Sequence, residues 1–193
     1  LQGTGLVPQQ LADPKALMST TQKVTVLRNV QRLSAVPDVG LRAGCRQRLS
    51  DFGVWGYALA SSATFGDAVV LGIRHIKLAG PVLEKRFRVE GDRAIFEGCD
   101  VLQLGDILPL SSECWFSSIL KLGQTLLGSP GPLPGSLLRL PYPRPAHAAA
   151  YERVFGGAIE FDAGAMEWHF DAAALRQPLP NANPITAGLC AQF

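Results

Sequence analysis

Apolar side chains recur every three or four residues in the first part of the chain: Val24, Leu27, Val30 and Leu33. This spacing predicts a helix that begins near residue 20, with Thr20 or Thr21 as its cap. We expect it to end before Pro37, because proline disfavours helical geometry in the residue that precedes it. Residues 1–14 are expected to be irregular. The predicted helix follows them, and a turn at about 38–44 leads into another short segment.

The stretch at 52–69, FGVWGYALASSATFGDAV, divides at Ser61-Ser62. Before the serines, buried aromatic and apolar residues suit a short helix. After them, Thr64 and Asp67 have the three-residue spacing of a capping box, which predicts the start of a second helix that runs to about residue 78. Its apolar face consists of Phe65, Val69, Ile73 and Ile76.

Alternating apolar and polar positions follow Pro81, and Gly91-Asp92 suits a two-residue turn, so a β-hairpin is predicted at about 82–99. Shorter strand patterns occupy about 137–142 and 165–170. Between the hairpin and the first of these strands, an apolar stripe predicts a helix that Ser111 or Ser112 caps and that ends at Gly128. A further short helix is expected between the two strands, at 147–156. The order predicts an α+β fold, with N-terminal helices followed by a small, mostly antiparallel sheet packed with helices.

Composition limits the classes of function. Apolar residues make up 47% of the 193-residue chain and charged residues 18%. This balance is enough to form a real core and is consistent with one domain. The net charge of +2 gives no electrostatic case for nucleic-acid binding by this segment. We favour a solvated face for the basic residues that gather between Arg42 and Arg88, with an anion or partner site as the alternative.

No apolar run reaches the roughly 18 residues of a membrane span, and the N-terminus shows no signal peptide. The four cysteines form no CxxC pair, which is typical of reduced, buried thiols in a cytosolic protein. We therefore expect a cytoplasmic protein without a membrane partner.

No catalytic pattern is visible. The G-x-S-x-G nucleophile motif is absent, and Ser61 and Ser62 are expected to cap a helix. Gly53 and Gly56 lack the lysine and third glycine of a phosphate loop, so close approach of a neighbouring helix explains them better. We expect no enzyme, no metal and no cofactor.

Some side chains leave two interpretations open. His75 suits the boundary of an apolar helix face, but also a haem ligand or an effector contact. Glu167 and His169 share one strand face, which suits solvent exposure, or a metal site with ligands from elsewhere. The large aromatic residues either fill the core or wall a small-molecule pocket: Trp55, Tyr57, Trp115 and Trp168.

Five phrases resemble, in the right order, the N-terminal effector domain of AraC/XylS-type transcription regulators, often described as an arabinose-binding-type domain. They are PDVGLRAG (37–44), GVWGYALASSATFGDA (53–68), EGD (90–92), YPRPAHAAAYERVFGGAIEF (142–161) and FDAAALRQPLPNANP (170–184). Two departures stand out. Ala158 replaces a common proline, and Glu167-Trp168-His169 replaces a mostly apolar phrase.

The resemblance implies a bacterial regulatory domain that senses a small-molecule effector, forms a homodimer and reaches DNA only through a C-terminal helix-turn-helix domain missing here. We expect residues 1–193 to be one such domain, with a helical N-terminal part (1–48), an α+β core (49–180) and the start of a linker (181–193). The candidate effector contacts are polar groups beside aromatic residues: Trp55, Tyr57, Arg74, His75 and Trp115.

Two alternatives stay open. One is a protein-interaction or dimerisation module without a small ligand. The other is a cofactor sensor, with haem on His75 or a metal ion at Glu167 and His169.

Overall fold

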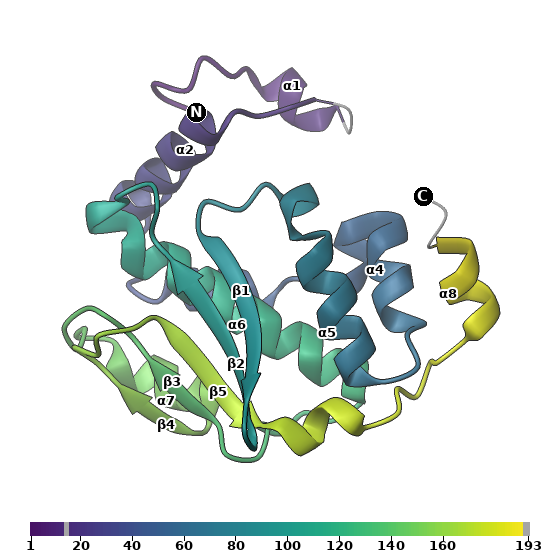
Figure 1. Ribbon diagram of the computed structural model, residues 1–193. Coiled ribbons are helices and arrows are strands. Elements are labelled where there is room, and N and C mark those ends of the chain that lie inside the picture. The colour runs from purple at the N-terminus through teal and green to yellow at the C-terminus, as the bar shows by residue number, and fades with distance from the viewer. Residues whose placement is uncertain (14–15, 191–193) are drawn as a thin grey trace.

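The computed structural model describes residues 1–13 and 16–190 (Figure 1), and within this part helices and a five-stranded sheet form the predicted α+β fold. Helix α1 (Pro8–Ala12) lies in a region that was expected to be irregular. Helix α2 (Thr20–Leu33) confirms the first predicted helix. Its cap is Ser19, one residue earlier than expected, whose hydroxyl accepts the Gln22 N–H.

The 52–69 stretch forms two helices with a serine joint, as predicted. Helix α4 (Gly53–Ala60) ends at Ser61, and helix α5 (Phe65–Arg74) starts after the cap residue Thr64. The capping box is complete: the Asp67 N–H donates to the Thr64 hydroxyl and the Thr64 N–H donates to the Asp67 carboxylate, both at 3.1 Å. The segment continues as a 3-10 helix (Ile76–Ala79).

Two glycines let helix α3 (Val39–Cys45) pack directly on helix α6 (Leu108–Leu127). A Cβ atom added at Gly44 would lie 2.0 Å from the Ser117 hydroxyl oxygen and 2.2 Å from the Cys114 carbonyl oxygen. A Cβ atom at Gly40 would lie 2.5 Å from a carboxylate oxygen of Glu113. Close helix contact therefore explains the glycines of the PDVGLRAG phrase.

Helix α6 begins earlier than predicted. Ser111 and Ser112 were expected to cap it, but it starts at Leu108 and both serines lie inside its first turns. Pro109 occupies the first turn, where the missing N–H leaves no helix hydrogen bond unmade. The helix ends as predicted at Gly128, whose positive φ is left-handed, the usual geometry of a glycine that terminates a helix.

The sheet has the order β1-β2-β5-β3-β4, and its neighbours are antiparallel except for the parallel pair β3 and β4. Its strands are β1 (Glu84–Glu90), β2 (Arg93–Cys99), β3 (Leu137–Arg139), β4 (Ala158–Glu160) and β5 (Glu167–Asp171). The hairpin and the other two expected strands are thus present. Strand β4 was not predicted, because three residues are too few to show an alternating pattern.

The register gives the sheet two different faces. Phe87, Phe96, Trp168 and Leu138 are aligned across four strands and belong to the hydrophobic core. The opposite face carries a row of charges, aligned across all five strands: Arg86, Glu97, Glu167, Arg139 and Glu160. In Figure 1, helix α6 passes behind the sheet, with α7 (Ala148–Phe155) behind β3 and β4.

The C-terminal part returns to the N-terminal helices. Helix α8 (Pro184–Cys190) lies beside α4, at the far end of the molecule from β4 (Figure 1). It falls within the range that was expected to start a linker.

Candidate functional site

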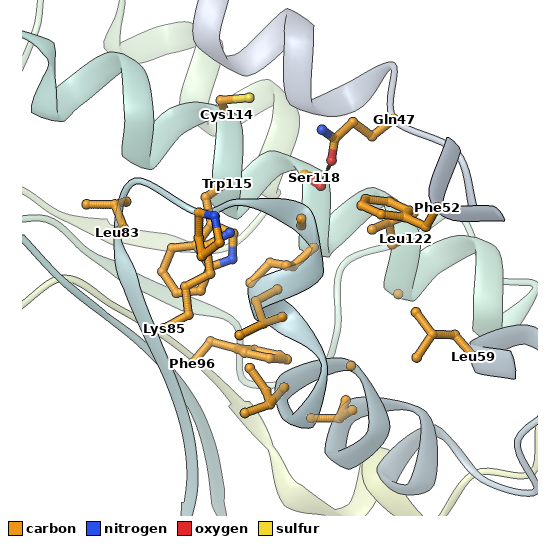
Figure 2. Close-up of a pocket in the computed structure, with 18 of the residues that line it drawn as sticks. Gln47, Phe52, Leu59, Leu83, Lys85, Phe96, Cys114, Trp115, Ser118 and Leu122 are labelled. Carbon is orange, nitrogen blue, oxygen red and sulfur yellow. Dashed lines mark hydrogen bonds between the residues drawn. The ribbon is translucent and has the colours of Figure 1, made fainter. Parts of the chain in front are cut away.

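A cavity of about 560 Å³ lies between the β1–β2 hairpin and helices α2, α4, α5 and α6 (Figure 2). This volume is within the usual range for small-molecule sites. The predicted apolar faces of two helices form much of its wall. Helix α5 contributes Phe65, Val69 and Ile73, and helix α6 contributes Trp115, Ile119, Leu122 and Leu126.

The structure separates the predicted contact residues into two groups. Trp55 and Trp115 line the cavity. Tyr57 points away from it with 63% of its surface exposed, because α4 turns Trp55 and Leu59, which are one helical turn apart, toward the inside. Arg74 and His75 are exposed at the C-terminal end of α5 and are not among the described lining residues.

Lys85 is a charged residue on the core-facing side of strand β1. It occupies the position between Leu83 and Phe87 in the alternating pattern and lines the cavity. Its Nζ atom lies 5.2 Å from the centroid of the Trp115 ring. Burial, helped by the positive charge of Lys23, lowers the pKa of the Lys85 ammonium to about 8. No carboxylate in residues 1–13 and 16–190 forms an ion pair with it.

Lys23, on α2, supplies a second cation to the cavity wall. Its Nζ atom donates to the backbone carbonyl oxygens of Ala79, at 3.2 Å, and Gly80. Burial lowers the pKa of this ammonium as well. The hydrogen bonds to two carbonyl groups stabilise the Lys23 charge, whereas Lys85 has the face of an indole ring as its neighbour.

Two buried polar atoms of the cavity wall have no hydrogen-bond partner among the described residues: Trp55 Nε1 and Ser111 Oγ. Most buried polar atoms in folded proteins are paired, because an unpaired one keeps its full desolvation penalty. Gln47 and Ser118, in contrast, are paired with each other, since the Ser118 hydroxyl donates to the Gln47 side-chain oxygen (Figure 2).

Neither lysine was among the residues expected at the site. The signal was a charge within an apolar pattern: Lys85 stands between Leu83 and Phe87 on a strand, and Lys23 precedes Leu27 by one turn on a helix. Ser111 was interpreted as a helix cap. It instead lies inside the helix, one turn before Trp115, and is one of the residues that line the cavity.

A second buried polar group joins α6 to α7. The Glu113 carboxylate, only 3% exposed, accepts a hydrogen bond from the Tyr151 hydroxyl and lies 2.7 Å from both that oxygen and His147 Nε2. Tyr142 extends the network to Tyr151 and Ser112. Burial raises the pKa of Tyr142 to about 12 and raises that of Tyr151 as well. These residues hold two helices together outside the cavity.

The charged face of the sheet surrounds Glu167, the residue proposed above for an alternative metal site. Burial opposes ionisation of this carboxylate, but hydrogen bonds from Arg88 and His169 outweigh it and lower its pKa. Arg88 Nη2 lies at 2.7 Å, His169 Nε2 at 2.9 Å and Arg139 Nη1 at 3.2 Å. Two guanidinium groups at this distance repel a metal cation. Over the described residues, no group of three His, Cys, Asp or Glu side chains is placed to bind a metal.

The sequence also predicted that the chain has no membrane span and that its cysteines are reduced. None of the helices in the described part of the chain combines the length and apolar character that a membrane span requires. All four cysteines are free thiols of intermediate burial: Cys45, Cys99, Cys114 and Cys190.

Comparison with known proteins gives one family and several related regulators. Residues 1–179 match the family described as the arabinose-binding domain of AraC transcription regulators, N-terminal. The ornithine utilization regulator of Pseudomonas aeruginosa is 29% identical over 188 residues, 96% of this chain and 54% of that protein. An uncharacterized HTH-type transcriptional regulator of Mycobacterium tuberculosis is 31% identical over 81 residues, 40% of this chain and 23% of that protein.

The fold also matches a solved structure. The crystal structure of the transcriptional regulator CdpR from Pseudomonas aeruginosa has a TM-score of 0.70 and 24% identity, and the match covers 94% of this chain and 58% of that one. Nearly the whole of this chain matches the ornithine utilization regulator and CdpR, but it spans only about half of the length of each of them. These proteins are transcription regulators and not enzymes, as the sequence led us to expect. The chain belongs to the family of N-terminal arabinose-binding domains of AraC-type transcription regulators.

Proposed function

We propose that this chain is the ligand-sensing part of an AraC-type regulator and that the cavity holds its effector. One observation carries the proposal: a mostly apolar cavity with two buried polar atoms, Trp55 Nε1 and Ser111 Oγ, that have no partner among the described residues. A site that is apolar with a few unsatisfied polar groups is suited to a small molecule. Trp55 and Trp115 are then effector contacts, as the sequence suggested.

The walls of the cavity come from separate parts of the fold, so an effector would change how these parts pack. An effector that binds one arrangement more tightly than another shifts the population between them. Helix α6 supports this coupling, because it lines the cavity through Trp115 and contacts α3 and α7 through Gly44 and Glu113. We propose that residues 1–193 act as one cytoplasmic regulatory domain and that DNA is bound by a helix-turn-helix part outside them.

Ornithine is not the effector that we propose, although one relative is named for ornithine utilization. Ornithine carries two ammonium groups, which need carboxylate partners. Asp51 is the single carboxylate among the described lining residues, and it already accepts the Arg48 N–H at 2.9 Å. Lys23 and Lys85 give the wall the same positive charge as the ammonium groups of ornithine, which it would repel.

A pair of tryptophan substitutions on α5 tests the proposal. Ile73→Trp places a large side chain in the cavity, whereas Val70→Trp places it on the exposed side of the same helix. Compounds from a metabolite library are screened for a rise in the melting temperature of the 193-residue chain. We expect at least one compound to raise it in the parent and in Val70→Trp, but not in Ile73→Trp. The proposal fails if no compound acts, or if Ile73→Trp responds as the parent does.

Dimerisation is the second candidate function, and a group of exposed apolar side chains on the neighbouring helices α4 and α8 favours it: Val54, Tyr57, Ile185 and Leu189, each at least 51% exposed. A second copy of the chain would cover them. We expect sedimentation velocity to show a dimer that Ile185→Glu converts to a monomer. A monomer at every concentration of the parent chain would exclude this candidate.

A further inference from the structure

The two lysines of the described cavity lining lie near each other. Lys85, Lys23 and Ser111 all line the cavity, and Lys85 lies against Trp115. In Figure 2, Lys85 and Leu83 lie on one side of the cavity, and Leu59 and Leu122 lie on the opposite side. Along α6 the lining residues change in the same direction, from Ser111 to Leu126, over about four turns of helix. The space therefore suits an elongated molecule with one polar end.

The positive charge of these lysines is not neutralised by the described part of the protein. Both lysines are partly buried, and an ammonium that loses much of its water is normally paired, because its removal from water is costly without a counter-charge. Lys23 has two carbonyl oxygens as partners. In the same part of the chain, Lys85 has only the Trp115 ring and the repulsion of Lys23, while burial raises the pKa of the Cys114 thiol, which keeps this neighbour neutral. The missing component is an anion.

We propose that the effector is a monocarboxylate with an elongated apolar body, its carboxylate paired with Lys85 and its apolar body extending toward Leu59 and Leu126. The inference rests on the proposed function and names the ligand class of the same site. One ammonium without a counter-charge among the described residues matches a single carboxylate, and the mostly apolar lining matches a chain or ring without further charge.

Three probes of equal length and different charge test the inference: decanoate, decanol and decylamine, each below the concentration at which it forms micelles. Titration calorimetry on the 193-residue chain at pH 7 measures their affinities. We expect decanoate to bind at least tenfold more tightly than decanol, and decylamine to bind most weakly. Lys85→Met, which keeps the length of the side chain, is expected to reduce decanoate binding to the level of decanol. Lys121→Met is the matched control, because Lys121 is an exposed lysine of α6 outside the described lining.

The outcomes separate this inference from the proposed function. If decanol or decylamine binds as tightly as decanoate, or if Lys85→Met leaves decanoate binding unchanged while Ile73→Trp abolishes it, the carboxylate assignment is overturned and the sensing cavity stands. If other library compounds bind the cavity and decanoate does not, the assignment is likewise overturned. If no compound of any charge binds, the proposed function fails with it. The comparison of three probes on the parent chain decides the question even if a variant does not fold.

Discussion

The Nζ atom of Lys85 lies 5.2 Å from the centroid of the Trp115 ring, so a strand and a helix meet in a cation–π contact inside the cavity wall. Gly98, paired with Lys85 across the hairpin, makes this contact possible. A Cβ atom at Gly98 would lie 2.7 Å from the Trp115 ring. The indole can therefore lie against the sheet, and the lysine can lie over the indole.

Lys85→Met should stabilise the empty protein. The pKa of Lys85 in the folded protein, about 8, is below its ordinary value, so below pH 8 folding carries the full penalty of burying a charged ammonium. The penalty corresponds to at most about 3 kcal/mol. As pH rises from 8 to about 10.4, the folded lysine loses its proton first and the penalty disappears. Urea unfolding at pH 7 and pH 10 should show a gain in unfolding free energy for Lys85→Met at the lower pH that shrinks at the higher one.

Lys121→Met is the control for this measurement. Because Lys121 is exposed, removing its ammonium group should change the unfolding free energy little. A Lys85→Met variant that is less stable than the parent at pH 7 would contradict the prediction, and would mean that a counter-charge already neutralises Lys85.

Carboxylate binding should weaken above pH 8. A bound anion favours the charged form of Lys85, so binding above that pH must take up a proton, and affinity falls by up to about tenfold per pH unit. The other titratable groups near Lys85 are Lys23 on α2 and Cys114 on α6. Burial lowers the pKa of Lys23, which reinforces the fall, and raises that of Cys114, which delays its ionisation. Decanoate titrations at pH 7, 8 and 9 test this, and Lys85→Met should show a much flatter profile.

Gly44→Ala should destabilise the protein by at least about 2 kcal/mol, because overpacking a close contact forces the backbone to shift. The new methyl group has to push α3 away from the Cys114 carbonyl of α6. Gly164→Ala is the matched control, since nothing lies within 4 Å of a Cβ atom there and its φ is not positive. Thermal unfolding compares the two. Equal melting temperatures would show that the helices separate without cost at Gly44.

Tyr151→Phe should cost about 1–3 kcal/mol of unfolding free energy, because a buried acceptor is left without its donor. The acceptor is the Glu113 carboxylate, which loses a hydroxyl donor at 2.7 Å. Tyr57→Phe removes the same atom from a side chain that is 63% exposed. That change should alter stability by less than about 0.5 kcal/mol. Urea unfolding of both variants tests this, and similar losses would show that the exposed hydroxyl matters as much as the buried one.

Local signals predicted most of the secondary structure. The Thr64–Asp67 capping box and the Gly91-Asp92 turn depend on neighbours in sequence, so they were visible without the fold. The apolar stripes of α5 and α6 were also correctly identified. Strand β4 was not predicted, because it forms by pairing with β3, which is a contact between segments that are distant in sequence.

The site depends on packing that no periodicity reveals. An apolar stripe has the same sequence pattern whether it fills a core or lines a cavity. The sequence therefore could not decide whether Trp55 and Trp115 fill the core or contact an effector. The exposure of Tyr57 follows from the rotation of α4, and that of Arg74 and His75 from the position where α5 ends. Lys85 could have been found as the charge that interrupts the inner face of a predicted strand.

All the described residues that line the cavity fall between Lys23 and Leu126. The phrase at 142–161 builds α7 and β4, and the phrase at 170–184 runs from the end of β5 through a 3-10 helix (Ala172–Arg176) that packs on α5. Under the proposed function, the residues that contact the sensed compound therefore come from the first two thirds of the chain. Under that function, we expect substitutions that change which compound is bound to lie in the first two thirds of the domain.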